Sequence, residues 1–312
     1  MTPDLPGLRW FGRRLVLSVL AAALVTTLAF GLVALTPDPN EGSIAYQVAR
    51  ETGGNGTAVE EALQDYREAR NRDDPLPERY VGYLVNTATL DWGPSFSRGR
   101  PVSAVLGDAL PVTAAYVGLA LALSTAGGMV LGVYGALGAG SLRDRTVSIV
   151  VYGLFGLANF YLVAVPALDW LGRPPPMRTV VGPALLLTTT LVVGQLRYAR
   201  GASLESLDHD FVKLARAKGA GSLRVARHVA RNVAVPLLSL SFSELFAVLV
   251  LEAFVVERVF GLNGLATVTL AAVNARDLPL IVGATMTVAF AGIAANFLQD
   301  LARQLLDPRA EG

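Results

Sequence analysis

Glu244 is the one ionisable residue near the middle of a long apolar run, residues 233–251. A carboxyl group inside a bilayer is energetically costly, so an acidic residue found there usually has a functional role. Glu244 is therefore a candidate for the translocation path of a transporter or for a proton site. The alternative is a structural carboxyl group satisfied by its neighbours, because Ser239, Ser241 and Ser243 surround it.

The sequence carries none of the common catalytic motifs. A GxxxxGK[ST] phosphate loop, a GxSxG nucleophile turn and an HExxH zinc helix do not occur in its 312 residues. It has no cysteine, which excludes disulfides and thiolate chemistry, and its two histidines, His209 and His228, share one polar segment. We therefore expect a protein that is not an enzyme and that holds no cofactor or metal of its own.

The segment 206–236 is a basic, moderately polar stretch between two apolar runs. Its pattern predicts two short helices, the second over 223–232, joined at Gly219 and Gly221, because glycine readily takes the left-handed angles that end a helix. The apolar face of the first helix comprises Phe211, Leu214 and Ala215. Basic side chains flank this face: Lys213, Arg216, Lys218, Arg224, Arg227 and Arg231. The segment is either a surface for a partner's cleft or an ordinary loop kept in the cytoplasm by its charge.

The composition is typical of an integral membrane protein. Hydrophobic residues make up 53% and charged residues 16%, against about 25% charged in an average soluble domain, and the mean hydropathy is +0.48. Apolar runs of about the length that spans a bilayer as a helix occur at 15–35, 109–142, 146–168, 179–196, 233–251 and 278–299. We therefore predict six transmembrane helices. Glycines crowd the end of the second run, where they would let helices approach closely: Gly127, Gly128, Gly132, Gly135 and Gly138.

The distribution of arginine and lysine predicts the orientation. Short basic loops stay in the cytoplasm, so the N-terminal arginines, the loop with Arg143 and Arg145, the central basic loop and the C-terminus are expected inside. The polar segment 36–108 is then external. Within it Thr57 and Glu60 form a capping box that predicts a helix to about Arg70.

From Asp210 onward the residues resemble a known family, the permease subunits of ABC importers, and within it the dipeptide/oligopeptide and nickel branch. The resemblance in the central segment rests on Asp210-Phe211-Val212, the sequence RAKG at 216–219, Arg227-His228 and Arg231-Asn232. Further along the chain it rests on Glu257, Val259-Phe260, Gly264-Leu265, Arg276-Asp277-Leu278-Pro279 and Asp307-Pro308-Arg309. The external loop departs from the family pattern where Leu262-Asn263 replaces Trp-Pro.

This resemblance implies an all-α integral membrane protein of the type I ABC importer permease architecture. It would comprise residues 1–35 with the first transmembrane helix, the external segment 36–108, and a core permease domain, 109–312, with its cytoplasmic coupling loop at 199–232. In that family the loop docks on a separate ATPase subunit, which uses the ATP. The implied partners are a second permease, two ATPase subunits, an external solute-binding protein and membrane lipid, with no nucleic acid, in the plasma membrane of a prokaryote.

The residues implied by the resemblance fall into three groups. The ATPase-coupling group is Asp210, Phe211, Leu214, Ala215, Arg216, Ala217, Lys218 and Gly219. The junction with the fifth helix is Arg227, His228, Arg231, Asn232 and Pro236. The external-loop group is Glu257, Phe260, Gly264, Arg276, Asp277 and Pro279.

The expected function is the membrane-spanning permease subunit of an ATP-driven importer of dipeptides or oligopeptides. The same architecture importing nickel chelates or oligosaccharides is one alternative. A proton-coupled secondary carrier that uses Glu244 is another, and it predicts transport by this chain without an ATPase.

Overall fold

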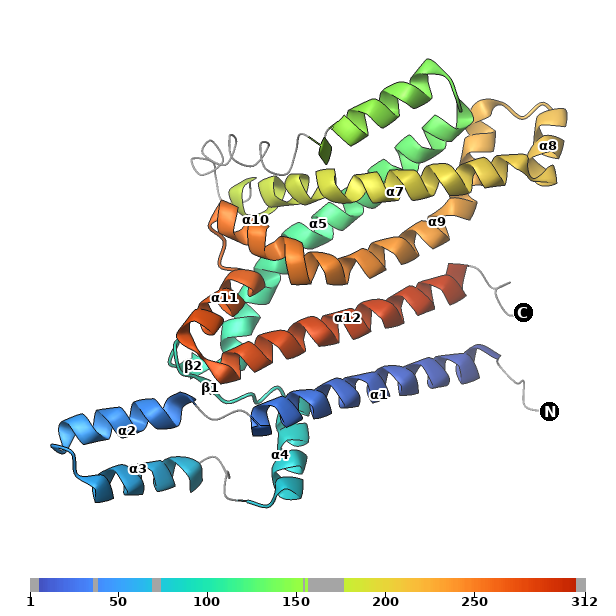
Figure 1. Ribbon diagram of the computed structural model, residues 1–312. Coiled ribbons are helices and arrows are strands. Elements are labelled where there is room, and N and C mark those ends of the chain that lie inside the picture. The colour runs from blue at the N-terminus through green and yellow to red at the C-terminus, as the bar shows by residue number, and fades with distance from the viewer. Residues whose placement is uncertain (1–5, 36–38, 69–73, 154, 157–176, 307–312) are drawn as a thin grey trace, which may run out of the picture. The chain divides into compact units, whose positions relative to one another are not determined.

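A computed structural model describes residues 6–35, 39–68, 74–153, 155–156 and 177–306 (Figure 1). Five helices in these ranges are long and apolar enough to cross a membrane: Trp10–Leu35, Val102–Leu137, Thr179–Asp208, Ser222–Phe260 and Leu278–Ala302. They correspond to five of the six predicted spans. The sixth prediction, 146–168, lies largely outside the described residues, although 142–153 are helical. The tail motif at 307–309 also lies outside them.

The chain divides into two compact units. The described residues of 1–18, 108–267 and 291–312 form one unit, and those of 19–107 and 268–290 form the other. Several helices pass from one unit into the other along the chain, among them α1 (Pro6–Leu35), α5 (Val102–Leu137) and α12 (Leu278–Leu306).

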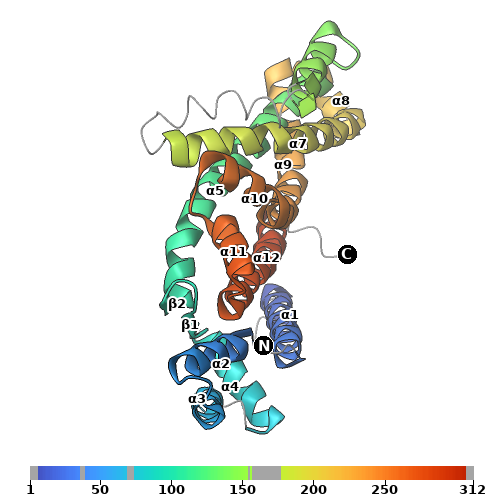
Figure 2. The same cartoon turned by 60° about the vertical axis from the view of Figure 1, so that its left-hand side comes forward.

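The first unit is organised around α5, α7 (Gly182–Asp208) and α9 (Ser222–Ala247). Helices α7 and α9 run antiparallel, side by side, as both views show (Figures 1 and 2). A cluster of buried residues fills the space among these helices: Val133, Ala199, Val212, Val225, Val229, Val233 and Leu237. Short π-helical turns, η1 (Met177–Val181) and η2 (Val248–Glu252), precede α7 and follow α9, and η2 continues into α10 (Ala253–Phe260).

Glycine allows α5 to pack directly against the backbone of α7. A Cβ atom at Gly128 would meet the Cβ of Gln195 and come within 3.0 Å of the amide nitrogen of Leu196. One turn later, a Cβ at Gly132 would lie 2.6 Å from the Cβ of Ala199. These two glycines therefore act as the small residues that close helix packing in membranes requires.

The second unit contains the polar segment that follows the first span. Helices α2 (Pro39–Glu51) and α3 (Gly56–Glu68) pair, and Arg67 donates to both carboxylate oxygens of Glu41. Helix α4 (Leu76–Ala88) packs on α1 through Tyr80, whose ring lies 5.3 Å from that of Phe30. The strands β1 (Pro94–Ser95) and β2 (Arg100–Pro101) form a short antiparallel hairpin.

The N-terminus of α3 differs from the predicted capping box. The side chain of Asn55, not that of Thr57, caps the helix: its Oδ1 accepts from the N–H of Thr57 at 3.1 Å and from the hydroxyl of Thr57 at 2.6 Å. The helix starts one residue before Thr57, so Thr57 lies inside it and its hydroxyl serves the cap instead of forming it.

Candidate functional site

A short helix, α8 (Asp210–Ala217), lies between the end of α7 and the start of α9. Val212 anchors it, because this side chain is 1% exposed and belongs to the buried cluster with Val225 and Val229 of α9 and Ala199 of α7. A movement of α8 would therefore be passed directly to both long helices. Sequence reasoning named Val212 in the family motif but left it off the apolar face of this helix, although its spacing of three residues from Ala215 is helical.

The opposite side of α8 faces outward. Leu214 is 57% exposed, and the basic side chains of Lys213, Arg216 and Lys218 are exposed with it. Ala215 is half-buried and Ala217 is exposed; the side chain of Phe211 lies outside the description. Asp210 and Lys213 form an exposed ion pair at 3.5 Å, an arrangement that contributes little to stability.

Gly219 ends α8 in a defined geometry. Its φ of 78° is left-handed, and the N–H of Ala220 donates to the carbonyl of Ala215 at 3.0 Å while the N–H of Gly219 donates to that of Arg216 at 2.9 Å. This pair of bonds is the Schellman motif. The chain then enters α9 at Ser222, and α9 runs without interruption to Ala247. The predicted short helix over 223–232 is thus the first part of a long one.

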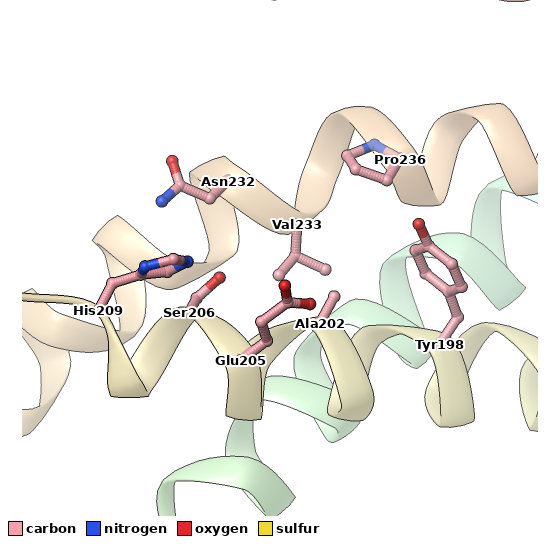
Figure 3. A pocket seen from close by; sticks show the side chains of 8 residues that line it. All are labelled: Tyr198, Ala202, Glu205, Ser206, His209, Asn232, Val233 and Pro236. Carbon is pink, nitrogen blue, oxygen red and sulfur yellow. The ribbon is translucent and has the colours of Figure 1, made fainter.

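Beside α8, the facing sides of α7 and α9 line an open groove of about 470 Å³ (Figure 3). Its lining residues are Tyr198, Ala202, Glu205, Ser206, His209, Asn232, Val233 and Pro236. Because proline has no N–H, Pro236 cannot donate to the carbonyl of Asn232 one turn earlier, which weakens α9 at the groove. Of the predicted junction residues, Asn232 and Pro236 line the groove, while Arg227, His228 and Arg231 are exposed.

An ion pair that sequence reasoning missed ties α7 to the first turn of the helix over 142–153, which follows α5. Arg200 donates from Nε and Nη2 to the two oxygens of Asp144, both at 2.7 Å, and the N–H of Gly140 donates to the same carboxylate at 3.1 Å. The hydrogen bonds from Arg200 lower the pKa of Asp144 to about 2, although burial opposes this shift. Neither residue belongs to a recognisable motif, so the sequence offered no signal for the pair.

Glu244 lies deep in α9, about 33 Å along the helix from Ser222, and so it does not belong to the α8 surface. Its partner is Gln195 of α7, whose Nε2 donates to Oε2 of Glu244 at 2.5 Å. The neighbouring serines donate to backbone carbonyls of their own helix, as Ser241 does to Leu237 and Ser243 to Leu240. We expected the neighbouring serines to hydrogen-bond to the carboxyl group of Glu244, whereas its observed partner is Gln195.

A second acidic residue, Glu252, follows at the end of η2 and lines a cavity of about 300 Å³ with residues of α7 and α10. Sequence reasoning missed it because it stands one residue beyond the apolar run that ends at Leu251. Its place on the helix depends on the π-turn, which no sequence pattern revealed.

Glu257 of the external-loop group is fully buried and accepts hydrogen bonds from three residues that belong to two other helices. The hydroxyls of Thr113 and Tyr116 in α5 donate to its Oε1 at 2.7 and 3.0 Å, and the N–H of Thr267 in α11 (Leu265–Ala275) donates to Oε2 at 2.7 Å. A Cβ at Gly264 would collide with this carboxylate. The carboxylate of Glu257 and the backbone at Gly264 are thus closely packed, and Phe260 is buried beside them.

Asp277 plays a similar role in the second unit, at the N-terminus of α12. Its Oδ2 accepts from the hydroxyl of Ser95 at 2.6 Å and from the N–H and hydroxyl of Ser97 at 2.8 and 2.7 Å. Burial raises the pKa of Asp277, but the hydrogen bonds from Ser95 and Ser97 outweigh it and the net shift is downward. The preceding Arg276 has a φ of 54°, and Pro279 occupies the first turn of α12, where proline is tolerated.

Comparison with known proteins gives a consistent result over nearly the whole chain. Residues 128–312 match the family described as "Binding-protein-dependent transport system inner membrane component". The dipeptide transport system permease protein of Bacillus subtilis (strain 168) is 30% identical over 305 residues, which cover 92% of each chain. The probable peptide ABC transporter permease protein of Sinorhizobium fredii (strain NBRC 101917 / NGR234) is 28% identical over 315 residues, covering 95% of this chain and 97% of that protein.

Proposed function

Because the chain belongs to the family of binding-protein-dependent transport system inner membrane components, we propose that it is a permease subunit of a peptide importer. Membership makes it a non-catalytic, multi-pass protein of the inner membrane that works with an ATPase and a binding protein. The peptide substrate is our inference from the names of its relatives, which are dipeptide and peptide permeases.

We further propose that α8 is the coupling helix that docks on the ATPase. The observation that carries this proposal is the division of α8 into two sides. Val212 is buried against α7 and α9, while Leu214 and three basic side chains are presented outward. An exposed apolar residue with cationic neighbours suits a cleft in a partner, and the buried side carries any displacement to the long helices.

The proposed architecture is that of type I ABC importer permeases, with six transmembrane helices and both termini in the cytoplasm. The sixth span falls in 146–168, whose first residues belong to the helix over 142–153. The translocation path then lies between this chain and a second permease, and the external segment 36–108 and the loop 252–277 face the binding protein. Two ATPase subunits complete the assembly.

The α8 proposal is tested by affinity purification of the tagged full-length chain from its own host, with the ATPase activity that co-purifies as the readout. Leu214→Asp is expected to remove most of that activity. Leu223→Asp, a substitution at a side chain that is 84% exposed in the first turn of α9, is the matched control and is expected to retain it. Equal ATPase recovery for both variants contradicts the assignment of α8.

The peptide proposal is tested on the purified complex reconstituted in proteoliposomes with its binding protein. Uptake of a radiolabelled tripeptide that requires ATP is the expected result. Uptake of a nickel chelate or an oligosaccharide without peptide uptake would replace the substrate assignment. Peptide uptake driven by a proton gradient, with no ATPase present, would instead favour a secondary carrier.

A further inference from the structure

Helix α4 contacts α1 at a level that lies within the first membrane span. The hydroxyls of Tyr80 and Thr27 are hydrogen-bonded at 2.7 Å, and the rings of Tyr80 and Tyr83 lie 5.3 and 5.5 Å from the ring of Phe30. The span ends at Leu35. At 1.5 Å per residue, Thr27 and Phe30 therefore stand about 12 Å and about 8 Å before that end, measured along the helix axis.

The charged residues of α1 indicate where the apolar part of the bilayer begins and ends. Arg13 and Arg14 are the last charged residues of α1, and the apolar run from Leu15 continues to Leu35. A helix of this length covers about 32 Å, against about 30 Å for the hydrocarbon core of a bilayer. Leu35 therefore stands near one boundary of the hydrocarbon, and the contacts of α4 lie in that half of the bilayer. In the proposed orientation this half is the outer leaflet.

The two sides of α4 differ in what covers them. Figure 1 shows α4 crossing the end of α1 instead of running along it, so α4 lies roughly parallel to the membrane surface. The side toward α1 carries Tyr80 and Tyr83, a residue type that is enriched at membrane–water interfaces. The opposite side presents Val81 and Val85, one helical turn apart, which are 58% and 55% exposed. Because α4 meets α1 sideways, both of its sides lie at a similar depth in the membrane.

The distribution of charge separates α4 from the rest of the polar segment. No charged residue occurs between Arg79, in the first turn of α4, and Asp91, beyond its end. The paired helices α2 and α3 carry acidic and basic residues, among them the ion pair of Glu41 with Arg67. The α2–α3 pair thus suits water. Helix α4 suits the bilayer interface, where a helix parallel to the surface buries its apolar face about 5–10 Å deep.

The residue that ends α4 is a second, independent observation. The N–H of Asp91 donates to the carbonyl of Asn86 at 2.8 Å, and the N–H of Leu90 donates to that of Thr87 at 3.3 Å. These bonds form a Schellman motif, whose left-handed residue is usually glycine. Here it is Leu90, with a φ of 59° that strains any residue with a Cβ. Its side chain is 54% exposed, so packing against the described residues does not account for a leucine, whereas insertion into lipid offsets the strain.

We propose that α4 is an interfacial membrane anchor, with Val81, Val85 and Leu90 inserted among the lipid acyl chains of the outer leaflet. Only the name of the leaflet rests on the proposed orientation, and the proposal is independent of the transported solute. A water-soluble partner such as the binding protein would not reach a face at the depth of Thr27 and Phe30. The part of the external segment left for that protein is then the α2–α3 pair.

The experiment is spin-label accessibility in the full-length chain in phosphatidylcholine/phosphatidylglycerol nanodiscs. The chain has no cysteine of its own, so one introduced cysteine carries the only label. Collision rates are measured with oxygen, which concentrates in lipid, and with a water-soluble nickel chelate, before and after assembly with the partner subunits and the binding protein. Leu28→Cys, 61% exposed in α1 between Thr27 and Phe30, is the lipid reference at matched depth. Glu61→Cys, exposed on α3, is the water reference.

The ratio of oxygen to nickel collision rates at Val85→Cys should exceed that at Glu61→Cys several-fold and approach that at Leu28→Cys. Assembly should leave it unchanged. Val81→Cys and Leu90→Cys should repeat the result, so that one misfolded variant does not decide the outcome. A ratio equal to that of Glu61→Cys would place this face in water and overturn the proposal. Loss of collisions with both reagents on assembly would also overturn it, since a partner protein would then cover the face.

Discussion

Gly128→Ala tests the close approach of α5 and α7. The new Cβ would meet the Cβ of Gln195, and it would lie 2.9 Å from the carbonyl carbon of Gln195 and 3.0 Å from the amide nitrogen of Leu196. Because two of these three atoms belong to the backbone, a change of rotamer cannot relieve the overlap and the helices must move apart. Overpacking of this kind costs about 1–3 kcal/mol of unfolding free energy.

Gly127→Ala is the matched control, one residue earlier on the same helix. Its new Cβ would lie 3.7 Å from Cγ2 of Val192, which is an ordinary van der Waals contact. Both substitutions gain the higher helix propensity of alanine, about 1 kcal/mol, so that gain cancels when the two variants are compared. We expect Gly128→Ala to be less stable than Gly127→Ala by about 1–3 kcal/mol.

The measurement is unfolding of the full-length chain in mixed micelles of dodecyl maltoside with a rising fraction of sodium dodecyl sulfate, followed by far-UV circular dichroism. The midpoint for Gly128→Ala should fall below that for Gly127→Ala. Equal midpoints would refute the reasoning, since they would mean that α5 and α7 are not in backbone contact at this position. Gly132→Ala should repeat the effect, because its new Cβ would lie 2.9 Å from the amide nitrogen of Arg200.

Three further predictions use the same unfolding assay. Gly264→Ala should lower the free energy of unfolding by about 1–3 kcal/mol, because its new Cβ collides with the carboxylate of Glu257. When Glu257 is also replaced by alanine, the same change should cost much less. An undiminished cost would show that the two residues do not touch. Arg276→Gly should stabilise the chain by about 1 kcal/mol, because a φ of 54° strains any residue with a Cβ; a destabilised variant would mean that the arginine side chain makes a contact worth more than this strain. Because Arg200 holds the pKa of Asp144 at about 2, below its ordinary value, their pair stabilises the fold fully above about pH 4 and loses this effect as the pH falls through 2. Asp144→Asn should therefore be less stable than the wild type at pH 6, with a difference that shrinks toward pH 2; a difference that does not change with pH would count against the pair.

The sequence predicted the membrane helices well, because each apolar run must be long enough to span the bilayer and charged residues within it are energetically costly. It also predicted the break at Gly219, where the left-handed φ needs no tertiary information. The prediction of a separate helix over 223–232 failed for a local reason. Helix α9 continues through Pro236, a residue type that usually lies at a helix boundary, and the sequence did not show that the helix would pass it.

The partners of the charged residues could not be predicted, because each lies far away in the sequence. Glu244 is bound by a residue 49 positions earlier, and Asp144 by one 56 positions later. Glu252 was hidden by a different effect. Periodicity assigns a residue to a face by assuming about 3.6 residues per turn, and the π-turn before Glu252 breaks that assumption.

Helix α7 connects the polar contacts of the first unit with α8. Along one continuous helix it contributes Leu187 to the cavity of Glu252, Gln195 to Glu244 and Arg200 to the ion pair with Asp144, and it ends at Asp208 directly before α8. A rigid helix transmits an axial or rotational displacement along its length, and its backbone contact with Gly128 and Gly132 of α5 leaves little room for sideways movement. If α8 moves with an ATPase, the displacement therefore reaches both α7 and α9, because Val212 of α8 packs against both helices.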